Sequence, residues 1–464
     1  MKNTVPALVC LLLAACGGGG GGGSTASTGS TGSTGTGTGT TTPVATYKIA
    51  GLIVGLEASG LVVANNTTDT VAVAKAGTSF VFGTQLAAGA AYAVTFPTQP
   101  MGFQACSIAS GASGTVATTD VSLIVNCADA VVSASTLAGS DTSGFADGMG
   151  SAALFGGAPT LAVTGTRLAG LALDSTGNIY VADPLNSRIR KITVDGVVTT
   201  YAGSGAFGST DGAAATASFS TPAAMVFDAA GNMYVTDTQA HNVRKITPAG
   251  VVSTFAGSGI YSSVDGTGTA ASFRAPSGIV IDTAGNLYVG DAEAHVIRKI
   301  TSAGVVTTFA GTTNVAGSAD GTGTTASFND PAGLAIDASG NLFVADAKNN
   351  EIRKITAAGV VTTYAGSTTA GSTNATGTAA TFNIPVNLSI DTDGFLYVAD
   401  SSNRLIRKIS PSGKVTTVAG GGTGTDTADT GTAASFVGPT SVVFDKSKTL
   451  YVADGNKVRK LVRK

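Results

Sequence analysis

The chain has 464 residues, of which 43% are hydrophobic and 12% charged, and the charges nearly cancel to a formal net of −2. This length and apolar content allow more than one hydrophobic core, and the sparse, balanced charge excludes the basic surface that binds nucleic acid. Sixty-four glycines, no tryptophan and abundant Thr, Val and Ala predict an all-β protein of short strands and tight turns.

Residues 1–15 have the form of a secretory signal peptide. An apolar stretch from Val5 to Ala15 follows Lys2 and is too short to span a bilayer as a helix. The tetrad that ends at Cys16, Leu-Ala-Ala-Cys, resembles the lipobox of bacterial lipoproteins, which implies cleavage before Cys16 and a lipid on its sulfur. The alternative is an ordinary signal peptide in which Cys16 is incidental. Because Gly17 follows the cysteine where aspartate resembles an inner-membrane retention signal, we expect a lipid anchor in the bacterial outer membrane, facing the periplasm or the cell surface.

Residues 16–43 are almost wholly Gly, Ser and Thr after Cys16. Such a composition cannot bury apolar surface and is typical of a flexible coil. We therefore predict a flexible linker that holds the folded part clear of the lipid surface.

Residues 44–130 predict a small β-sandwich. Short apolar runs alternate there with Gly, Asn and Asp turn signals. The runs are Tyr47–Ala50, Leu61–Ala64, Thr70–Val73, Phe80–Phe82, Tyr92–Phe96 and Val121–Val125. They indicate antiparallel strands, and the segment resembles the immunoglobulin-like modules that bacterial surface lipoproteins place before larger domains.

The four cysteines leave one pair for this small domain. Cys10 departs with the signal peptide and Cys16 takes the lipid, so Cys106 and Cys127 remain together in an oxidising compartment. We predict a disulfide, which for a loop of this size contributes about 3 kcal/mol of stability. The alternative, a metal or redox pair, lacks a Cys-x-x-Cys motif and nearby histidines.

Residues 131–464 contain six copies of one phrase, an aromatic residue, Val, a small residue and Asp, at spacings of 54, 54, 55, 54 and 54 residues. A fixed period of that length indicates one supersecondary unit, each copy of which buries its apolar faces against its neighbours. The copies are Tyr180–Asp183, Tyr234–Asp237, Tyr288–Asp291, Phe343–Asp346, Tyr397–Asp400 and Tyr451–Asp454.

Each copy predicts one blade of a β-propeller. In the third copy the four antiparallel strands are Gly278–Ile281, Leu287–Val289, Val296–Ile300 and Val305–Ala310. The sixth copy ends with its third strand, whereas an orphan strand, Ser135–Gly139, precedes the first copy. We therefore predict a six-bladed β-propeller in which the N-terminal strand closes the last blade and leaves no open sheet edge.

The motifs Asp-x-x-Gly-Asn, Tyr-Val-Ala-Asp and Ile-Arg-Lys-Ile resemble the NHL repeat family, roughly from Ala134 to Lys464. The resemblance implies a β-propeller, commonly six-bladed, that acts mostly as a binding platform and in a few relatives as a lyase or hydrolase.

Residues repeated in every copy are interpreted as structural. The end-of-strand aspartates, Asp183 through Asp454, are predicted to cap the loop that follows, rather than to form a ring of metal or acid residues. The Arg-Lys pairs, Arg190-Lys191 through Arg459-Lys460, are predicted to lie on solvated strand faces, with an anion or lipopolysaccharide patch as the alternative.

An Asp-Gly-x4-Ala-x-Phe-x2-Pro element separates the copies, and its phenylalanine is predicted to plug the seam between blades. Its aspartate is predicted to cap a single helical turn. These aspartates are Asp147, Asp211, Asp265 and Asp320, replaced by Asn374 and Ala428 in the last two copies.

Candidate ligand-binding residues are those at which the copies disagree. His241, His295, Asn350 and Arg404 share one loop position, and Asn387 is a polar residue on an otherwise apolar inner strand. The two histidines resemble those of peptidyl-hydroxyglycine lyases, which hold zinc on an NHL-type ring. Those enzymes also place histidines at the starts of inner strands, where this chain has Ala223, Ser277 and Ala332. Two imidazoles do not complete a zinc shell, so we expect no catalytic residue, no metal and no cofactor.

We therefore expect a monomeric, membrane-anchored envelope lipoprotein that acts as a non-enzymatic binding or scaffold module through its propeller loops. Its expected partner is an unidentified envelope protein or glycan, and not nucleic acid. Two alternatives are a metal-dependent lyase or hydrolase on the same ring, and a structural spacer.

Overall fold

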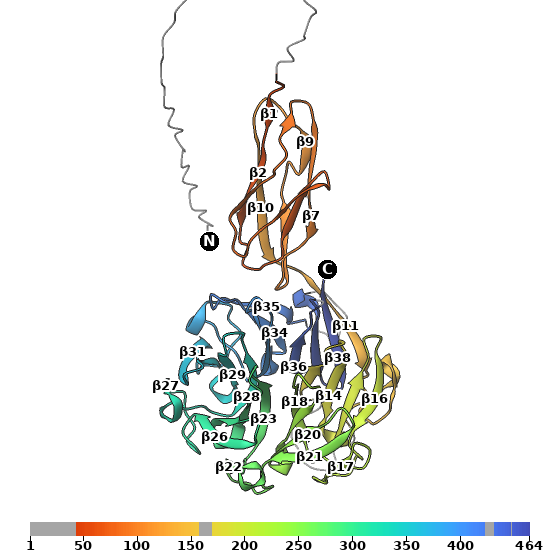
Figure 1. The fold of residues 1–464 in the computed structure, drawn as a ribbon, viewed down its shortest axis with the longest axis vertical. Helices are drawn as coiled ribbons and strands as arrows, with labels where there is room; N and C mark the ends of the chain where they lie inside the picture. The colour runs from red at the N-terminus through yellow and green to blue at the C-terminus, as the bar shows by residue number, and fades with distance from the viewer. Residues whose placement is uncertain (1–42, 157–168, 423–430, 447) are drawn as a thin grey trace, which may run out of the picture. The chain divides into compact units, whose positions relative to one another are not determined.

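The computed structural model describes residues 43–156, 169–422, 431–446 and 448–464, and these ranges are all-β (Figure 1). The expected signal peptide, Cys16, nearly all of the expected linker and Ala428 lie outside the described residues. Within the described ranges, no helix is long and apolar enough to cross a membrane. Residues Thr46–Lys464 form one compact unit.

The part of the chain before Ala130, which we call the small domain, contains two four-stranded sheets with the orders β5-β2-β10-β8 and β4-β3-β7-β9. One apolar core takes Ile53 and Leu123 from the first sheet and Val63 and Val94 from the second. The strands are β1 (Thr46–Tyr47), β2 (Ile49–Val54), β3 (Val62–Asn65), β4 (Asp69–Ala72), β5 (Ser79–Val81), β6 (Leu86–Ala87), β7 (Ala91–Thr98), β8 (Gln104–Ile108), β9 (Ser113–Thr115) and β10 (Val121–Asp129).

The prediction of a wholly antiparallel sandwich is wrong at one pair, because β2 and β10 run parallel. They are far apart in the chain, so no hairpin dictates their relative direction. The other strand pairs described in the small domain are antiparallel.

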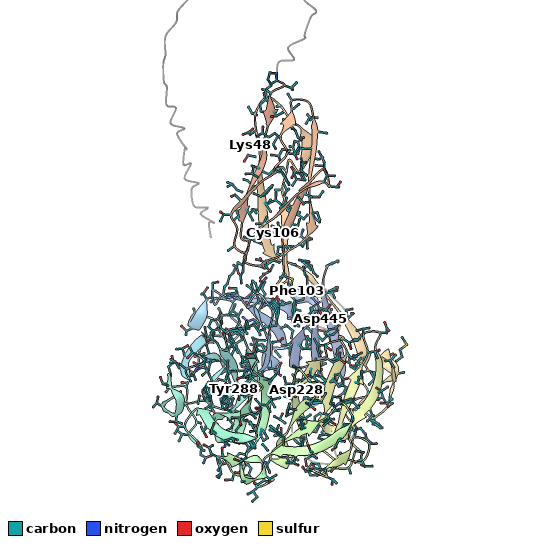
Figure 2. All side chains as sticks on the ribbon, viewed as in Figure 1. Lys48, Phe103, Cys106, Asp228, Tyr288 and Asp445 are labelled. Atoms are coloured by element: carbon teal, nitrogen blue, oxygen red, sulfur yellow. A yellow bond between two sulfur atoms is a disulfide. The ribbon has the colours of Figure 1, made fainter. Side chains whose placement is uncertain are left out.

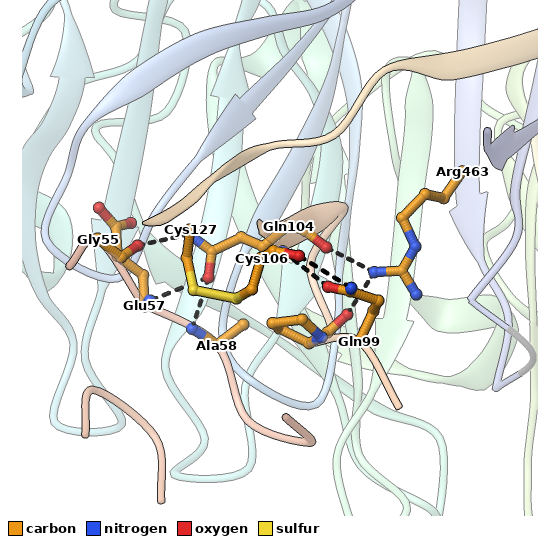
Figure 3. Close-up of a disulfide and its surroundings, with 9 residues drawn as sticks. Gly55, Glu57, Ala58, Gln99, Gln104, Cys106, Cys127 and Arg463 are labelled. Carbon is orange, nitrogen blue, oxygen red and sulfur yellow. Dashed lines mark hydrogen bonds between the residues drawn. A yellow bond between two sulfur atoms is a disulfide. The ribbon is translucent and has the colours of Figure 1, made fainter. Parts of the chain in front are cut away.

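The predicted disulfide is present at one end of the small domain (Figure 3). Cys106 of β8 and Cys127 of β10 are direct cross-strand partners. Gln99 binds both backbone groups of Cys106, accepting its N–H at 2.7 Å and donating to its carbonyl at 3.0 Å. The Gln104 side chain bonds the loop at residues 55–58. This end of the domain is therefore cross-linked by one covalent bond and several hydrogen bonds.

Each repeat folds into one antiparallel sheet, and the described strands give six such sheets of four or five strands (Figure 1). The innermost strands are β13 (Leu171–Leu173), β18 (Pro222–Phe227), β23 (Pro276–Ile281), β28 (Pro331–Ile336), β32 (Pro385–Ile390) and β36 (Pro439–Phe444). The second strands are β14 (Ile179–Asp183), β19 (Met233–Asp237), β24 (Leu287–Asp291), β29 (Leu342–Asp346), β33 (Leu396–Asp400) and β37 (Leu450–Asp454).

The outer strands follow the same order in each repeat. The third strands are β15 (Arg188–Ile192), β20 (Asn242–Ile246), β25 (Val296–Ile300), β30 (Glu351–Ile355), β34 (Leu405–Ile409) and β38 (Lys457–Arg463). The fourth strands are β16 (Val197–Ala202), β21 (Val251–Ala256), β26 (Val305–Ala310), β31 (Val360–Gly366) and β35 (Val415–Gly420). The four strands predicted for the third repeat thus match β23 to β26.

Short elements lie between these strands. A fifth strand that the sequence did not predict joins four of the sheets: β12 (Gly148–Met149), β17 (Gly212–Ala213), β22 (Gly266–Thr267) and β27 (Gly321–Thr322). Single 3-10 turns precede the next innermost strand at η1 (Gly150–Ala152), η4 (Gly268–Ala270), η6 (Gly323–Thr325), η8 (Gly377–Ala379) and η10 (Gly431–Ala433). Others follow the second strand at η2 (Pro184–Asn186), η3 (Thr238–Ala240), η5 (Ala292–Ala294), η7 (Ala347–Asn349) and η9 (Ser401–Asn403).

The sixth sheet joins the two ends of the repeat region. The strand β11 (Val132–Gly139) pairs antiparallel with β38, from Val132 opposite Arg463 to Gly139 opposite Lys457. The orphan strand therefore supplies the fourth strand that the last repeat lacks. This pairing leaves neither β11 nor β38 with an unpaired inner edge.

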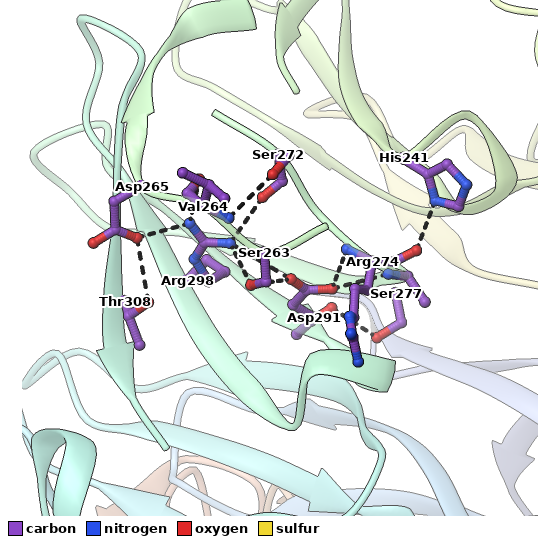
Figure 4. Close-up of polar contacts among 12 residues, drawn as sticks. His241, Ser263, Val264, Asp265, Ser272, Arg274, Ser277, Asp291, Arg298 and Thr308 are labelled. Atoms are coloured by element: carbon purple, nitrogen blue, oxygen red, sulfur yellow. Dashed lines mark hydrogen bonds and ion pairs between the residues drawn. The ribbon is translucent and has the colours of Figure 1, made fainter. Parts of the chain in front are cut away.

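The prediction that the Arg-Lys pairs are solvated is wrong for the arginines, all of which are fully buried: Arg190, Arg244, Arg298, Arg353, Arg407 and Arg459. In the third repeat, the Arg298 guanidinium lies 3.5 Å from Asp291 and 2.8 Å from Asp265 (Figure 4). It also lies over the Phe273 ring. Arginine and lysine are adjacent along the strand and therefore face opposite sides, and the arginine side is the one that enters the seam. A buried charge requires such partners.

The end-of-strand aspartates bind backbone N–H groups of an earlier loop, not the backbone of the following loop as predicted, although Asp183, Asp346 and Asp400 also accept from an asparagine side chain in the turn that follows. Asp291 Oδ1 accepts the N–H groups of Arg274 and Ala275, both at 2.9 Å, in the loop before β23. The side chain makes no cap hydrogen bond to η5, which follows it. Burial raises the pKa of Asp291, and these N–H groups together with Arg298 oppose that rise. The aspartate thus fastens the second strand to the start of the innermost strand.

The aspartates between copies do not cap the helical turn. Asp265 precedes η4, whose N-cap is Thr267 without a side-chain cap bond, and it pairs with Arg298 instead. Asn374 keeps this contact in the fifth repeat by accepting from Arg407 Nη2 at 2.8 Å. The buried arginine explains why a carboxylate or amide oxygen recurs here.

The small domain contacts the fifth and sixth repeats (Figure 2). Phe103 lies edge-on to Tyr397 and Phe444, with ring centroids at 5.6 and 5.7 Å. Asp393 Oδ2 accepts both the backbone N–H and the hydroxyl of Ser59, at 2.8 and 2.9 Å.

The fifth repeat departs from the common pattern at this contact. Lys408 is buried and forms an ion pair with Asp129. Phe395 is fully buried against Gly102 and replaces an asparagine that elsewhere bonds the turn aspartate, as Asn286 bonds Asp282. Two apparent irregularities of the repeat are therefore used for contacts within the chain.

Candidate functional site

The innermost strands enclose two cavities, and one lies at the starts of these strands. This pocket of about 210 Å³ is lined mainly by small residues, among them Ala223, Ser277, Gly278, Ala332 and Gly333. A Cβ on Gly278 would lie 2.3 Å from the carbonyl oxygen of Ala332. Close backbone packing between neighbouring inner strands therefore explains the small residues at this end.

The second cavity, of about 350 Å³, is lined by residues from all six innermost strands. Asn387 touches both cavities. Its Oδ1 accepts the N–H of Val442 on the next inner strand at 3.1 Å, and the Ser277 hydroxyl likewise donates to the carbonyl of Pro331 at 3.1 Å. These polar groups are used to join inner strands, which accounts for Asn387 without a ligand.

The loop candidates occupy one equivalent position after the second strand. His241, His295, Asn350 and Arg404 all follow a 3-10 turn in the left-handed conformation, with φ of 54°, 60°, 56° and 57°. Three of them contact the loop before the next inner strand: His241 at the carbonyl of Arg274, His295 at the N–H of Asp330, and Asn350 at the N–H of Ile384. The structure therefore distributes them over successive seams and does not bring them together.

The two histidines differ in the nitrogen that carries the proton. His241 Nδ1 lies 2.6 Å from the Arg274 carbonyl oxygen, which only accepts, so Nδ1 holds the proton. His295 Nδ1 accepts the N–H of Asp330 at 3.2 Å, so its proton lies on Nε2. Burial lowers the pKa of His295, in keeping with a neutral ring. Opposite tautomers in two separate seams are a poor arrangement for a shared metal ion.

Among the residues that the structure describes, no group of three His, Cys, Asp or Glu side chains is placed to hold a metal ion. The pocket at the strand starts contains the positions, Ala223, Ser277 and Ala332, at which the lyases that the sequence resembles carry histidines. That the chain binds no metal or cofactor stays a prediction.

A different cluster, which sequence reasoning missed, lies on the loops around the third repeat. We call it the rim cluster and define it as His241, Ile260, Tyr261, Arg274 and Glu293. Tyr261 is 52% exposed, and its hydroxyl donates to Glu293 Oε2 at 2.6 Å. The Arg274 guanidinium lies over the Tyr261 ring at 5.1 Å from the centroid, and the His241 ring meets its edge at 5.4 Å. The cluster is an exposed aromatic ring held in place by three polar neighbours.

Copy-by-copy alignment was the signal that could have identified the rim cluster. Arg274 follows the seam phenylalanine, where other copies carry Ser220, Asn329 and Asn383. Figure 4 shows Arg274 between His241 and Asp291. The two histidines pointed to the loops of this cluster, but its distinctive residue is Arg274, whose backbone carbonyl contacts the His241 ring.

The NHL repeat family model matches residues 328–355, which confirms the resemblance found in the sequence. Protein SUPPRESSOR OF QUENCHING 1, chloroplastic, of Arabidopsis thaliana is 29% identical over 261 residues, 52% of this chain and 25% of that protein. NHL repeat-containing protein 2 of Homo sapiens is 29% identical over 278 residues, 52% of this chain and 38% of that protein. The chain spans well under half the length of these curated relatives.

Two solved structures share the fold over most of their length. A structural genomics protein of unknown function from Bacteroides thetaiotaomicron gives a TM-score of 0.56 at 18% identity, covering 92% of this chain and 99% of that one. An auxiliary nutrient binding protein from the same organism gives a TM-score of 0.53 at 16% identity, covering 88% and 92%. At these identities the likeness shows the fold.

Proposed function

We propose that the chain is a non-enzymatic binding or scaffold module of the bacterial envelope that contacts its partner through the loops around the third repeat. The rim cluster is the observation that carries this proposal. A spacer needs no exposed Tyr261 beside Ile260, which is 66% exposed, and exposed apolar groups rimmed by polar ones mark interaction sites. The small, mutually bonded groups at the strand starts favour binding over catalysis, since none of the described side chains lining that pocket titrates near neutral pH.

The proposed architecture is one closed ring of six blades preceded by an immunoglobulin-like sandwich. The six repeat-derived sheets, the pairing of β11 with β38 and the two-sheet core of the small domain support it. In this arrangement the loops that carry the rim cluster lie at the opposite strand ends from Asp393, which the small domain contacts.

The proposed location is the outer membrane, with a lipid on Cys16 and residues 16–43 as a linker. The support is the lipobox-like sequence and the two disulfide-linked cysteines, since disulfides persist in oxidising compartments. The solved structure named as an auxiliary nutrient binding protein adds nutrients to the partner classes that a test must include.

Affinity capture from envelope extracts tests this function. The bait is the mature chain with Cys16→Ser, and the loop variant adds Ile260→Ser and Tyr261→Ala. The control is Thr283→Lys. Thr283 is an exposed residue in the turn after β23, at the opposite end of that strand from the rim cluster. We expect a protein, glycan or nutrient to be retained by the bait and by the control and lost from the loop variant. No enrichment by the bait, or enrichment that survives the loop substitutions, contradicts the proposal.

A further inference from the structure

Arg274 is the part of the rim cluster whose interactions are incomplete. Its guanidinium lies over Tyr261, but its buried Nε has no hydrogen-bond partner. Across the described residues, no carboxylate lies within ion-pair distance of Arg274. A guanidinium presents five N–H donors and is always charged. Its binding capacity toward an anion is therefore unused within the described chain.

Arg188, which lies outside the rim cluster at the start of β15, shows what a satisfied guanidinium looks like in this protein. Arg188 lies 3.9 Å from the centroid of Phe145, a stack similar to that of Arg274 on Tyr261. Its two terminal nitrogens donate to the carbonyls of Asn186 and Ser204, at 2.9 and 2.8 Å. Stacking on an aromatic ring is therefore compatible with a guanidinium whose terminal nitrogens are bonded, whereas those of Arg274 have no acceptor among the described residues.

The acidic groups around Arg274 are already engaged. Glu293 accepts the Tyr261 hydroxyl, and Asp291 accepts two backbone N–H groups and lies beside Arg298. Asp330 pairs with Lys348 at 3.1 Å. An anion that neutralises Arg274 therefore has to come from outside the part of the chain that the structure describes.

The surroundings of Arg274 favour a polypeptide over a sugar. Ile260 is 66% exposed, Val264 53%, and Val315 on the next loop 50%. These aliphatic side chains offer a sugar no hydrogen bond, but they pack well against apolar side chains. Tyrosine and arginine dominate the strong positions of protein interfaces, and a ring already held by His241 and Arg274 loses little freedom on binding.

We propose that the rim cluster binds an acidic segment of a protein partner, with a carboxylate on Arg274 and an adjacent apolar side chain on Tyr261 and Ile260. The inference rests on the proposed binding function and names the partner's chemistry. The partner's carboxylate accepts charge-assisted hydrogen bonds from the Arg274 guanidinium, and such bonds are the strong class in proteins.

Two pools of fluorescent random peptides test the inference against the mature chain with Cys16→Ser. One pool has a glutamate-leucine pair fixed at its centre and the other a lysine-leucine pair, and fluorescence polarisation reports binding. We expect the glutamate pool to bind about tenfold more tightly, since a carboxylate accepts charge-assisted hydrogen bonds from a guanidinium and an ammonium group does not. Equal binding of the two pools overturns the inference.

Variants assign the effect to Arg274. Arg274→Gln is expected to remove the preference for glutamate, and Glu293→Gln to strengthen it by removing a nearby negative charge. Arg188→Gln is the matched control and is expected to leave the preference intact. A glutamate preference that persists in Arg274→Gln, with unchanged circular dichroism, overturns the inference.

The envelope capture separates this inference from the function on which it rests. Capture that is lost with the loop substitutions at Ile260 and Tyr261 but kept in Arg274→Gln contradicts the acidic segment and leaves the binding function standing. Capture of a glycan instead of a protein also contradicts the acidic segment and leaves the binding function standing. Absence of any captured partner contradicts the function itself.

Discussion

The third and fifth repeats depart from the common pattern in opposite ways. In the fifth, Phe395 and Lys408 are buried against the small domain, so both changes are used for contacts within the chain. In the third, Tyr261 is 52% exposed, the half-buried Arg274 lies over its ring, and no carboxylate of the described residues pairs with that arginine. A break in a repeat therefore indicates a special contact, and only the structure says whether that contact is internal or is left for a partner.

The largest expected loss of stability comes from removing the buried arginine, and it tests whether the arginine–aspartate pairs of the third and fifth repeats are equivalent. Arg298→Ala and Arg407→Ala should each lower the free energy of unfolding by about 4 kcal/mol, because each leaves a buried aspartate without its cation. Urea denaturation measures the loss. A loss below about 1 kcal/mol in one repeat would show that the two seams are not equivalent.

The next effect concerns the fifth repeat alone. Phe103→Ala should cost about 3 kcal/mol, since it removes a buried ring from between Tyr397 and Phe444. Calorimetry should then show a separate, earlier transition for the small domain. A single unshifted transition would mean that the two parts are not coupled through this ring.

A smaller effect is expected at the ion pair between the same two parts. Lys408→Met should cost about 1–2 kcal/mol by leaving Asp129 and the Gly102 carbonyl without their donor. The matched control is Lys299→Met in the third repeat, where the lysine lies half-buried over Tyr288. The comparison fails if both substitutions shift the denaturation midpoint equally.

The smallest effect on stability is expected at the rim cluster. Tyr261→Ala should change the free energy of unfolding by less than about 0.5 kcal/mol, because the side chain is half exposed and belongs to no described core cluster. The same substitution should abolish binding of the glutamate-leucine peptides. Loss of stability comparable to that of Phe103→Ala would place Tyr261 among the structural residues and remove the contrast between the repeats.

The repeated framework was predictable because one local pattern recurs six times. The tetrad that ends in Asp291 located every second strand, and the orphan strand at Ser135–Gly139 predicted the pairing of β11 with β38. The roles of Asp291 and Arg298 were not predictable, since their partners lie in loops brought close only by the fold. Strand alternation could have placed the arginine and lysine on opposite faces, but not which face enters the seam.

The candidate site was predicted only in part. His241 and His295 marked the correct loops, yet their Nδ1 atoms serve the seams between repeats. Asn387 was singled out because it is polar on an inner strand, and its amide joins that strand to the next. Arg274 was not predicted because a single arginine in a loop has no distinctive sequence pattern. Only the three-dimensional structure shows that no described carboxylate pairs with it.

The pairing of β11 with β38 has a consequence for the time course of folding. Roughly 300 residues separate the two strands, so at about 5–20 residues per second β11 leaves the ribosome on the order of 15–60 seconds before its partner exists. During that interval its edge is open to pairing with other chains. A message truncated before β38 should therefore yield a chain that cannot finish its sixth sheet and that aggregates.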